Sequence, residues 1–372
     1  MKKKITVIGG GNVGSAIAID LSKNHSVTVI DIFERNLPKP IHFSKANILK
    51  ENAEKILENS ELVITAVPGH TGFKILEKVI SAGKNVVDIS FFPEDPFLLD
   101  ELAKKNDVTA IVDCGLAPGL GNLVLGYHHA RMQVESFRCY VAGLPVERSW
   151  PFQYKAVFSP IDVIEEYTRP ARMVENGKVV TKEALSELEL IEIPGLGTLE
   201  AFNTDGLRTL LKTIPVPELL EKTMRYPGTT QYLEMLKKCG YFSDNTITVN
   251  DTSISPLDVT SELLFKQWKI KPGDEDLSVL AIKIEGKEAD KKMIHDYFMI
   301  DRYNEATQTL SMARTTGYTC AAAAELLVEG KFERKGICPP EYIGAKEEAF
   351  NFILDYLEKR DITFKRNTTY EK

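Results

Sequence analysis

Apolar strands and helical segments alternate along the first third of the chain. Residues 4–8 form a continuous apolar, β-branched run, which is typical of a strand buried on both faces. A helical pattern over 15–21 and a second strand over 26–30 follow directly. The same alternation continues, with strands expected at 62–66, 85–89, 108–112 and more weakly at 41–43, and helices around 50–58, 72–82 and 94–105. It predicts an α/β fold with a doubly wound parallel sheet, a Rossmann domain, over residues 1–120.

The middle of the chain has a different pattern, in which apolar and polar residues alternate over longer stretches. Asn176-Gly177 is a two-residue hairpin turn between strand-like arms. Strands are expected at 138–142, 154–158, 187–193 and 198–202, with helices beginning at Ser159, near Thr229 and at Ser255. These elements predict a second domain, of the α+β class, over 121–306. Helical patterns at 307–327 and 345–359 then predict that the segment 307–372 packs back on the Rossmann domain.

The first strand runs into a glycine loop with the spacing G-x-G-x-x-G. Gly9 permits the tight turn, Gly11 lets the backbone approach a pyrophosphate, and Gly14 lets the next helix pack close to the strand. Asn12 and Val13 belong to the same loop, whose following helix offers backbone N–H groups to the phosphates. The loop predicts a dinucleotide cofactor.

Asp31 ends the second strand, about 20 residues after the first glycine, where a carboxylate accepts hydrogen bonds from the adenosine ribose. Because a carboxylate repels the 2′-phosphate of NADP, the sequence predicts NAD; Arg35, four residues further on, is the residue that could instead bind that phosphate. Ligands bind at the carboxyl ends of parallel strands, so Val67, Pro68 and His70 are assigned to the cofactor site. His70 is either a proton carrier or an ordinary polar loop residue.

Composition and charge narrow the class of partner. The chain has 372 residues and a formal net charge of −7, with no basic patch that would indicate nucleic acid. No apolar run approaches the roughly 20 residues that span a membrane. The five cysteines are scattered and no Cys or His cluster has metal-ligand spacing, so neither a disulfide framework nor a metal is expected. We expect a cytoplasmic protein that acts on a small molecule.

Longer strings carry a family resemblance. DCGLAPGLGN, SPIDVIEEYTRPARMVENGK, EAFNTDGLRTLL, TMRYPG and SMARTTGYT occur in this order. They resemble the saccharopine dehydrogenase family, and most closely its L-lysine 6-dehydrogenase branch. The resemblance implies a homodimer of Rossmann and mixed-sheet domains that oxidises a C–N bond of an amino acid. One position departs from the family pattern: Thr229 stands where a His usually follows the RYPG segment.

Such an oxidation needs a base for the substrate ammonium and a cation for the substrate carboxylate. The candidate bases are Asp113, Lys155 and Asp205. Lys155 would need a pKa lowered by burial, while strand alternation could equally direct it to solvent; Asp113 could instead be a turn carboxylate. The remaining candidates, for binding the substrate, are Arg169, Arg208, Arg225, Thr204, Tyr226 and Thr229. Arg225 is the favoured clamp, since Arg169 could cap a helix end and Arg208 could form a surface ion pair.

Three functions fit these features. The first is NAD-dependent oxidative deamination of the ε-amino group of L-lysine, which gives ammonia and a semialdehyde that cyclises. The second is a saccharopine reductase, or a related enzyme that condenses an aldehyde with an amino acid. The third is an NAD-responsive binding protein that does not catalyse a reaction.

Overall fold

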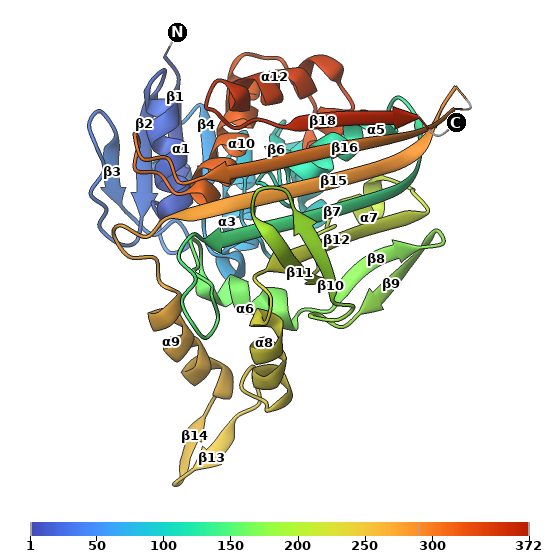
Figure 1. Ribbon diagram of the computed structural model, residues 1–372. Coiled ribbons are helices and arrows are strands. Elements are labelled where there is room, and N and C mark those ends of the chain that lie inside the picture. Colours follow the sequence, from blue (N-terminus) through green and yellow to red (C-terminus); the bar gives the residue numbers. More distant parts are fainter. Residues whose placement is uncertain (1, 290, 371–372) are drawn as a thin grey trace.

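The computed structural model describes residues 2–289 and 291–370, which form two large sheets and a two-stranded one, with helices packed between and around the large sheets (Figure 1). The described residues include a seven-stranded parallel sheet in the order β17-β6-β5-β4-β1-β2-β3. Its strands are β1 (Lys4–Ile8), β2 (Ser26–Asp31), β3 (His42–Lys45), β4 (Leu62–Thr65), β5 (Val86–Asp88), β6 (Thr109–Ile111) and β17 (Gly336–Cys338). The chain order reverses between β1 and β4, which is where α/β sheets of this kind bind ligands.

The helices of this first domain follow the predicted positions. They are α1 (Asn12–Ser22), α2 (Ala53–Leu57), α3 (Gly69–Ser81) and α4 (Asp100–Lys105), the last preceded by the 3-10 turn η1 (Pro96–Leu99). The central strands β1 and β4 are buried at every position except Lys4, and apart from Lys4, Thr6 and Thr65 their residues are apolar, as a sheet covered on both faces requires. The predicted Rossmann fold is confirmed.

The second domain is built on a mixed sheet, as the family resemblance implies. The described strands run in the order β10-β11-β12-β7-β15-β16-β18, with β8 and β9 attached to β12. They are β7 (Gln133–Pro145), β8 (Ala171–Glu175), β9 (Lys178–Lys182), β10 (Glu189–Ile193), β11 (Gly197–Asn203), β12 (Glu218–Arg225), β15 (Asp276–Glu288), β16 (Lys291–Arg302) and β18 (Lys365–Tyr370). Asn176 and Gly177 form the predicted turn between β8 and β9.

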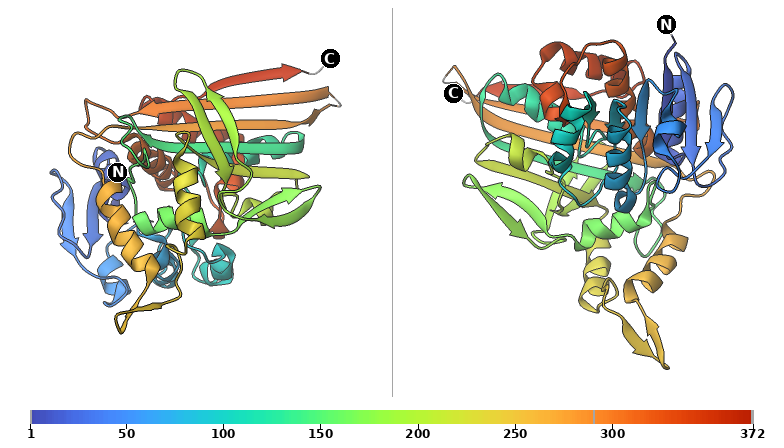
Figure 2. Two further views of the ribbon diagram at one scale, coloured as in Figure 1. Left: turned by 60° about the horizontal axis from the view of Figure 1, so that its bottom comes forward. Right: turned by 180° about the vertical axis from the view of Figure 1, so that it is seen from behind.

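Helices and a small hairpin complete the second domain. They are α5 (Leu120–His129), α6 (Pro160–Thr168), α7 (Leu210–Thr213), α8 (Thr229–Lys238), β13 (Ile247–Val249), β14 (Thr252–Ile254) and α9 (Pro256–Trp268). Figures 1 and 2 show α8, α9 and the hairpin projecting from the rest of the molecule.

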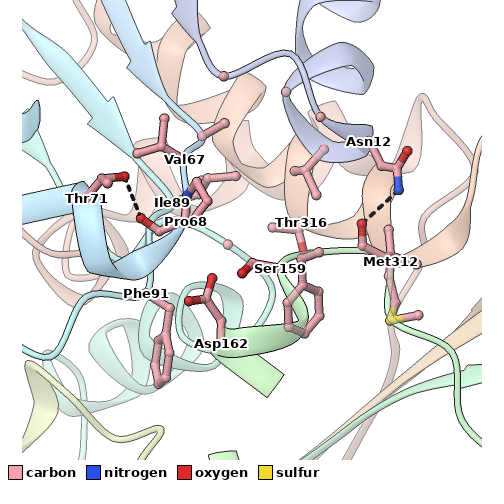
Figure 3. A pocket seen from close by; sticks show the side chains of 18 of the residues that line it. Asn12, Val67, Pro68, Thr71, Ile89, Phe91, Ser159, Asp162, Met312 and Thr316 are labelled. Carbon is pink, nitrogen blue, oxygen red and sulfur yellow. Dashed lines mark hydrogen bonds between the residues drawn. The ribbon is translucent and has the colours of Figure 1, made fainter. Parts of the chain in front are cut away.

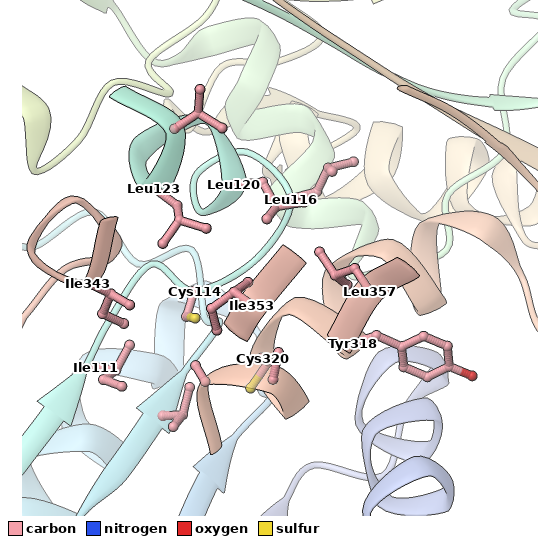
Figure 4. Packing of buried hydrophobic residues seen from close by; sticks show 14 of the residues in the cluster. Ile111, Cys114, Leu116, Leu120, Leu123, Tyr318, Cys320, Ile343, Ile353 and Leu357 are labelled. Atoms are coloured by element: carbon pink, nitrogen blue, oxygen red, sulfur yellow. The ribbon is translucent and has the colours of Figure 1, made fainter. Parts of the chain in front are cut away.

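The last segment begins with α10 (Ser311–Val328), which is buried at every residue from 311 to 326 except the half-buried Thr316. Its run Ala321–Ala324 has no exposed surface, and small side chains there and at Gly317 allow close packing against α1. Figure 4 shows Tyr318 and Cys320 of α10 among Ile111 and the α12 residues Ile353 and Leu357. The helices α11 (Pro340–Gly344) and α12 (Glu347–Glu358) follow, and α12 packs on α10.

Three details differ from the sequence prediction. The segment 154–158 is not a strand; it is an irregular loop with one isolated bridge, between Ala156 and Lys269. The last segment is not purely helical, because β17 extends the parallel sheet beside β6. Its other strand, β18, lies against β16 of the mixed sheet. β17 has only three residues and β18 is exposed at every position, so neither shows the apolar alternation from which strands were predicted.

Candidate active site

One cavity of about 740 Å³ extends from the glycine loop across the boundary between the domains to strand β12. The carboxyl ends of β1, β2 and β4 line one half, which we call the nucleotide half. Side chains of α6, of the segment 204–206 and of β12 line the other, which we call the substrate half. Figure 3 shows the middle of the cavity, where Asp162 of α6 points toward Pro68 at the start of α3.

The three fingerprint glycines have the environments that the sequence predicts. A Cβ atom on Gly9 would overlap the carbonyl oxygen of Ala66, and one on Gly14 would overlap the carbonyl oxygen of Gly9. A Cβ on Gly11 would meet nothing within 4 Å, because Gly11 borders the open cavity at the N-terminus of α1. The loop therefore leaves space for a phosphate beside unpaired backbone N–H groups.

Asp31 lies at the end of β2 and is held by three donors. It accepts hydrogen bonds from the backbone N–H of Gly10 (2.8 Å) and of Phe33 (2.9 Å), and Arg35 Nε lies 2.9 Å away. Burial acts to raise the pKa of Asp31, but these hydrogen bonds outweigh it and the pKa is lowered. A carboxylate that stays ionised beside the glycine loop fits the ribose of a dinucleotide, so the residues present fit this cofactor.

The other residues assigned to the cofactor also line the cavity, namely Asn12, Val13, Val67, Pro68 and His70. Asn12 connects the two domains, since its side-chain amide donates to the carbonyl of Val157 (2.8 Å). His70 is exposed.

Four of the residues assigned to the substrate or to proton transfer line the substrate half. Thr204 shares a hydrogen bond of 3.0 Å with Thr223, and Asp205 forms a two-point ion pair with Arg172, at 2.8 Å for both contacts. Arg225 is buried, and each of its three guanidinium nitrogens donates a hydrogen bond. It contacts Glu166 (2.8 Å), the Tyr167 hydroxyl (3.2 Å) and its neighbour's carbonyl, and it stacks on the Tyr154 ring.

Arg169 differs from Arg225 in having a free donor. It pairs with Glu165 through one nitrogen and lies over the ring of Phe91, 4.8 Å from its centroid. Its Nη1 atom is buried and has no hydrogen-bond partner among the described residues. An unpaired buried donor is costly, so Nη1 is suited to an acceptor that enters with the substrate. The structure thus favours Arg169 over Arg225 as the clamp.

Five assigned residues do not line the cavity. Asp113 and Arg208 form a buried ion pair with each other (2.9 Å), and Arg208 also donates to the carbonyl of Phe92. Lys155 points away, toward Asp274 at 3.8 Å, because the adjacent Tyr154 faces the cavity. The Tyr226 hydroxyl and the Thr229 hydroxyl donate to the carbonyls of Pro145 and Phe152. We therefore leave these five residues out of the proposed site.

Sequence reasoning missed four carboxyl groups that line the substrate half: Asp162, Glu165, Glu166 and Glu221. Burial raises the pKa of Asp162 to about 7 and that of Glu221 to about 8, and it also raises the pKa of Glu166. Three of the four lie within the string SPIDVIEEYTRPARMVENGK, in the helix expected to begin at Ser159. Asp162 accepts a hydrogen bond from the backbone N–H of Gly69 at the start of α3 (3.2 Å).

Comparison with known proteins now gives the family. Residues 5–111 match the saccharopine dehydrogenase NADP binding domain, and residues 115–362 match the saccharopine dehydrogenase C-terminal domain. This chain belongs to the saccharopine dehydrogenase family. The resemblance carried by the five strings is therefore confirmed at the level of the family. The description of the family's nucleotide-binding domain names NADP, whereas Asp31 predicts NAD.

The individual relatives of this saccharopine dehydrogenase family member are distant. The mitochondrial alpha-aminoadipic semialdehyde synthase of Mus musculus is 24% identical over 449 residues, which cover 99% of this chain but 48% of the relative. The chain thus spans about half the length of such relatives. The NADP(+), L-glutamate-forming saccharopine dehydrogenase of Saccharomyces cerevisiae is 23% identical, covering 91% of this chain and 94% of the relative.

A solved structure supports the fold. The apo saccharopine dehydrogenase (L-Glu forming) from Saccharomyces cerevisiae has a TM-score of 0.80 at 19% identity, covering 99% of this chain and all of that one. None of the described helices is both long and apolar enough to cross a membrane. Within the described residues, no group of three or more His, Cys, Asp or Glu side chains is placed to hold a metal ion.

Proposed function

We propose that this chain is an oxidoreductase that uses NAD to oxidise the amine carbon of an amino acid, and that its reaction is the oxidative deamination of the ε-amino group of L-lysine. The observation that carries this proposal is the continuity of the cavity: the glycine loop and Asp31 open into the same space as a free arginine donor and a group of carboxyls. When bound, the cofactor supplies a hydride acceptor. The chain's own residues have to bind the two ends of the substrate and accept a proton.

The charges of the substrate half favour lysine over saccharopine. Its carboxyls, on Asp162, Glu165, Glu166, Asp205 and Glu221, outnumber the guanidinium groups beside them, which belong to Arg169, Arg225 and the Asp205 partner Arg172. Carboxylates attract an ammonium group and repel further carboxylates. Lysine brings one carboxylate and a distant ammonium, whereas saccharopine brings three carboxylates. A site with one free arginine donor and several acidic groups therefore fits lysine better.

A screen of cofactor reduction tests the function. L-lysine, ornithine, saccharopine and related diamines are supplied with NAD or with NADP, and the reduced cofactor and ammonia are measured over a range of pH. We expect L-lysine to reduce NAD with release of ammonia and formation of a cyclic imine, and NADP to react much more slowly. Saccharopine reacting readily while lysine does not would assign the chain to the second function, and no turnover with any amine would support a binding protein.

The role of Arg169 gives a prediction of its own. Replacing Arg169 by alanine should raise the KM for lysine roughly 10- to 100-fold and change kcat much less. Hydrogen bonds to charged groups contribute about 1.5–3 kcal/mol, and this one would form in substrate and transition state alike. Steady-state kinetics measure both constants. Arg148→Ala is the control, because Arg148 lies on the Tyr226 ring outside the cavity. An unchanged KM in Arg169→Ala would remove Arg169 from the site.

A further inference from the structure

We propose that Glu221 accepts the proton of the substrate ammonium, which makes it a catalytic residue; this inference rests on the amine oxidation proposed above. Glu221 lies on β12, four residues before Arg225, and lines the substrate half of the cavity. It is only 6% exposed, and its Oε2 atom has no hydrogen-bond partner among the described residues. A buried acceptor of this kind is available to a donor that arrives with the substrate.

The Glu221 carboxyl occupies a space that is open only because residue 206 is a glycine. A Cβ atom on Gly206 would overlap the Glu221 carboxyl, so any other residue at 206 would displace it. The hydroxyl of Thr204 and the backbone N–H of Gly206 lie close enough to act on the same carboxyl. The fold thus fixes the position of Glu221 in the cavity while leaving one of its oxygens unpaired.

The neighbouring carboxyls are each held by another group. Glu165 pairs with Arg169, Glu166 with Arg225 and Asp205 with Arg172, while Asp162 accepts from the Gly69 backbone N–H. Each partner lowers the pKa of its carboxyl, although burial still leaves the pKa of Asp162 and Glu166 raised. Each partner also already occupies its carboxyl, so a donor that arrives with the substrate would have to share it. Among the described carboxyls of the substrate half, Glu221 is the one without a cation or a helix N-terminus beside it.

The groups that face Glu221 also set its affinity for a proton. Burial is the main cause that raises its pKa to about 8, followed by the charges of Glu166 on α6 and Asp205 on the 204–206 segment. Arg225 on the same strand is engaged with Glu166, and on β7 burial raises the pKa of the Cys139 thiol so far that it stays protonated. Glu221 is therefore neutral below about pH 8 and a carboxylate above it. A carboxylate with this raised pKa is a competent base near pH 8, where it becomes ionised.

The step itself is a proton transfer. An N–H bond of the substrate ammonium breaks, its proton goes to Glu221 Oε2, and the electron pair of that bond stays on nitrogen: R–CH2–NH3⁺ and –COO⁻ become R–CH2–NH2 and –COOH. The neutral amine can then release hydride from the adjacent carbon, which the ammonium cannot. The pKa of a free lysine ammonium is about 10.4, so without Glu221 the neutral amine is scarce at pH 8.

Kinetics of Glu221→Gln over pH test the role. For the wild type, kcat/KM with lysine should rise with pH and level off above about pH 8. In Glu221→Gln this inflection should be lost. Activity at pH 8 should fall roughly 10²- to 10⁴-fold and recover as pH approaches 10.4, where the amine deprotonates in solution. Glu221→Asp should keep the inflection at a lower rate. Glu218→Gln, which removes a carboxyl outside the cavity on the same strand, should behave as the wild type.

A binding measurement gives a second readout that does not depend on turnover. L-lysine is titrated at pH 7 into the protein saturated with NADH, in two buffers of different ionisation enthalpy. The arriving ammonium should expel about one proton from Glu221 of the wild type, and none from Glu221→Gln.

The outcomes separate the two proposals. Lysine failing to reduce NAD in the wild type would overturn the proposed function. If lysine reacts, but Glu221→Gln keeps the wild-type pH profile or releases the same proton, then Glu221 is not the acceptor and only this inference is wrong.

Discussion

Replacing Gly11 by valine should give a protein that folds normally and does not measurably bind a dinucleotide. No atom lies within 4 Å of the position that a Cβ would take at Gly11, so the side chain costs the free protein little. The same side chain would fill the space that the glycine loop leaves for the pyrophosphate. Losing two charge-assisted backbone hydrogen bonds, at about 1.5–3 kcal/mol each, weakens binding roughly 10²- to 10⁴-fold.

Calorimetric titration with NAD and thermal unfolding measure the two parts of this expectation. Gly14→Ala is the matched control with the opposite outcome. A Cβ at Gly14 would overlap the carbonyl oxygen of Gly9, so this variant should lose stability before its affinity can be assessed. Wild-type affinity in a folded Gly11→Val protein would show that the cofactor does not bind at this loop.

Replacing Arg208 by alanine should destabilise the protein by about 3–5 kcal/mol, because it leaves Asp113 buried without its partner. The side chains of Arg208 and Asp113 are 3% and 1% exposed, and Arg208 also holds the carbonyl of Phe92. The pair joins the loop after β6 to the segment before α7, across the boundary between the domains. Urea unfolding of the single variants and of Asp113→Asn/Arg208→Leu should show strong coupling, with the double variant less damaged than the sum of the single changes.

The Arg208→Ala variant also shows whether Asp113 and Arg208 have a structural role or a role in the reaction. Asp113 and Arg208 were assigned from the sequence to proton transfer and substrate binding, and the structure pairs them outside the cavity. If Arg208→Ala keeps its stability and loses turnover with lysine, the assignment from sequence was right and the structural interpretation is wrong.

The fold was predictable wherever local pattern determines it. The strand and helix at the glycine loop, the hairpin at Asn176-Gly177 and the helix α10 all have signals contained in one short segment. The strand β17 was not recognised, because three residues are too few to show a period and it is defined by its pairing with β6, more than 200 residues earlier. The loop 154–158 has strand-like residues but packs against α9 through Trp268 without a ladder.

The two halves of the site were predictable to different degrees. Phosphate binding depends on backbone geometry that a fixed spacing of glycines encodes, so the loop and Asp31 were found. The substrate half is assembled from α6, the 204–206 segment and β12, and which side chains meet there depends on strand register and helix rotation. Lys155 and Tyr154 are adjacent in sequence, and a rotation that the sequence does not specify decided that Tyr154 faces the cavity.

The position of α10 and β17 has a consequence for how such a protein can be recombined. The match to the family's nucleotide-binding domain ends at residue 111, yet the sheet of that domain continues into β17 and its helix α1 is covered by α10. A gene fusion that transferred only the first 111 residues would carry an open sheet edge next to β6 and an uncovered apolar helix face, the usual beginnings of aggregation. The unit that can be exchanged between proteins is therefore discontinuous: it includes α10 and β17 as well as residues 5–111.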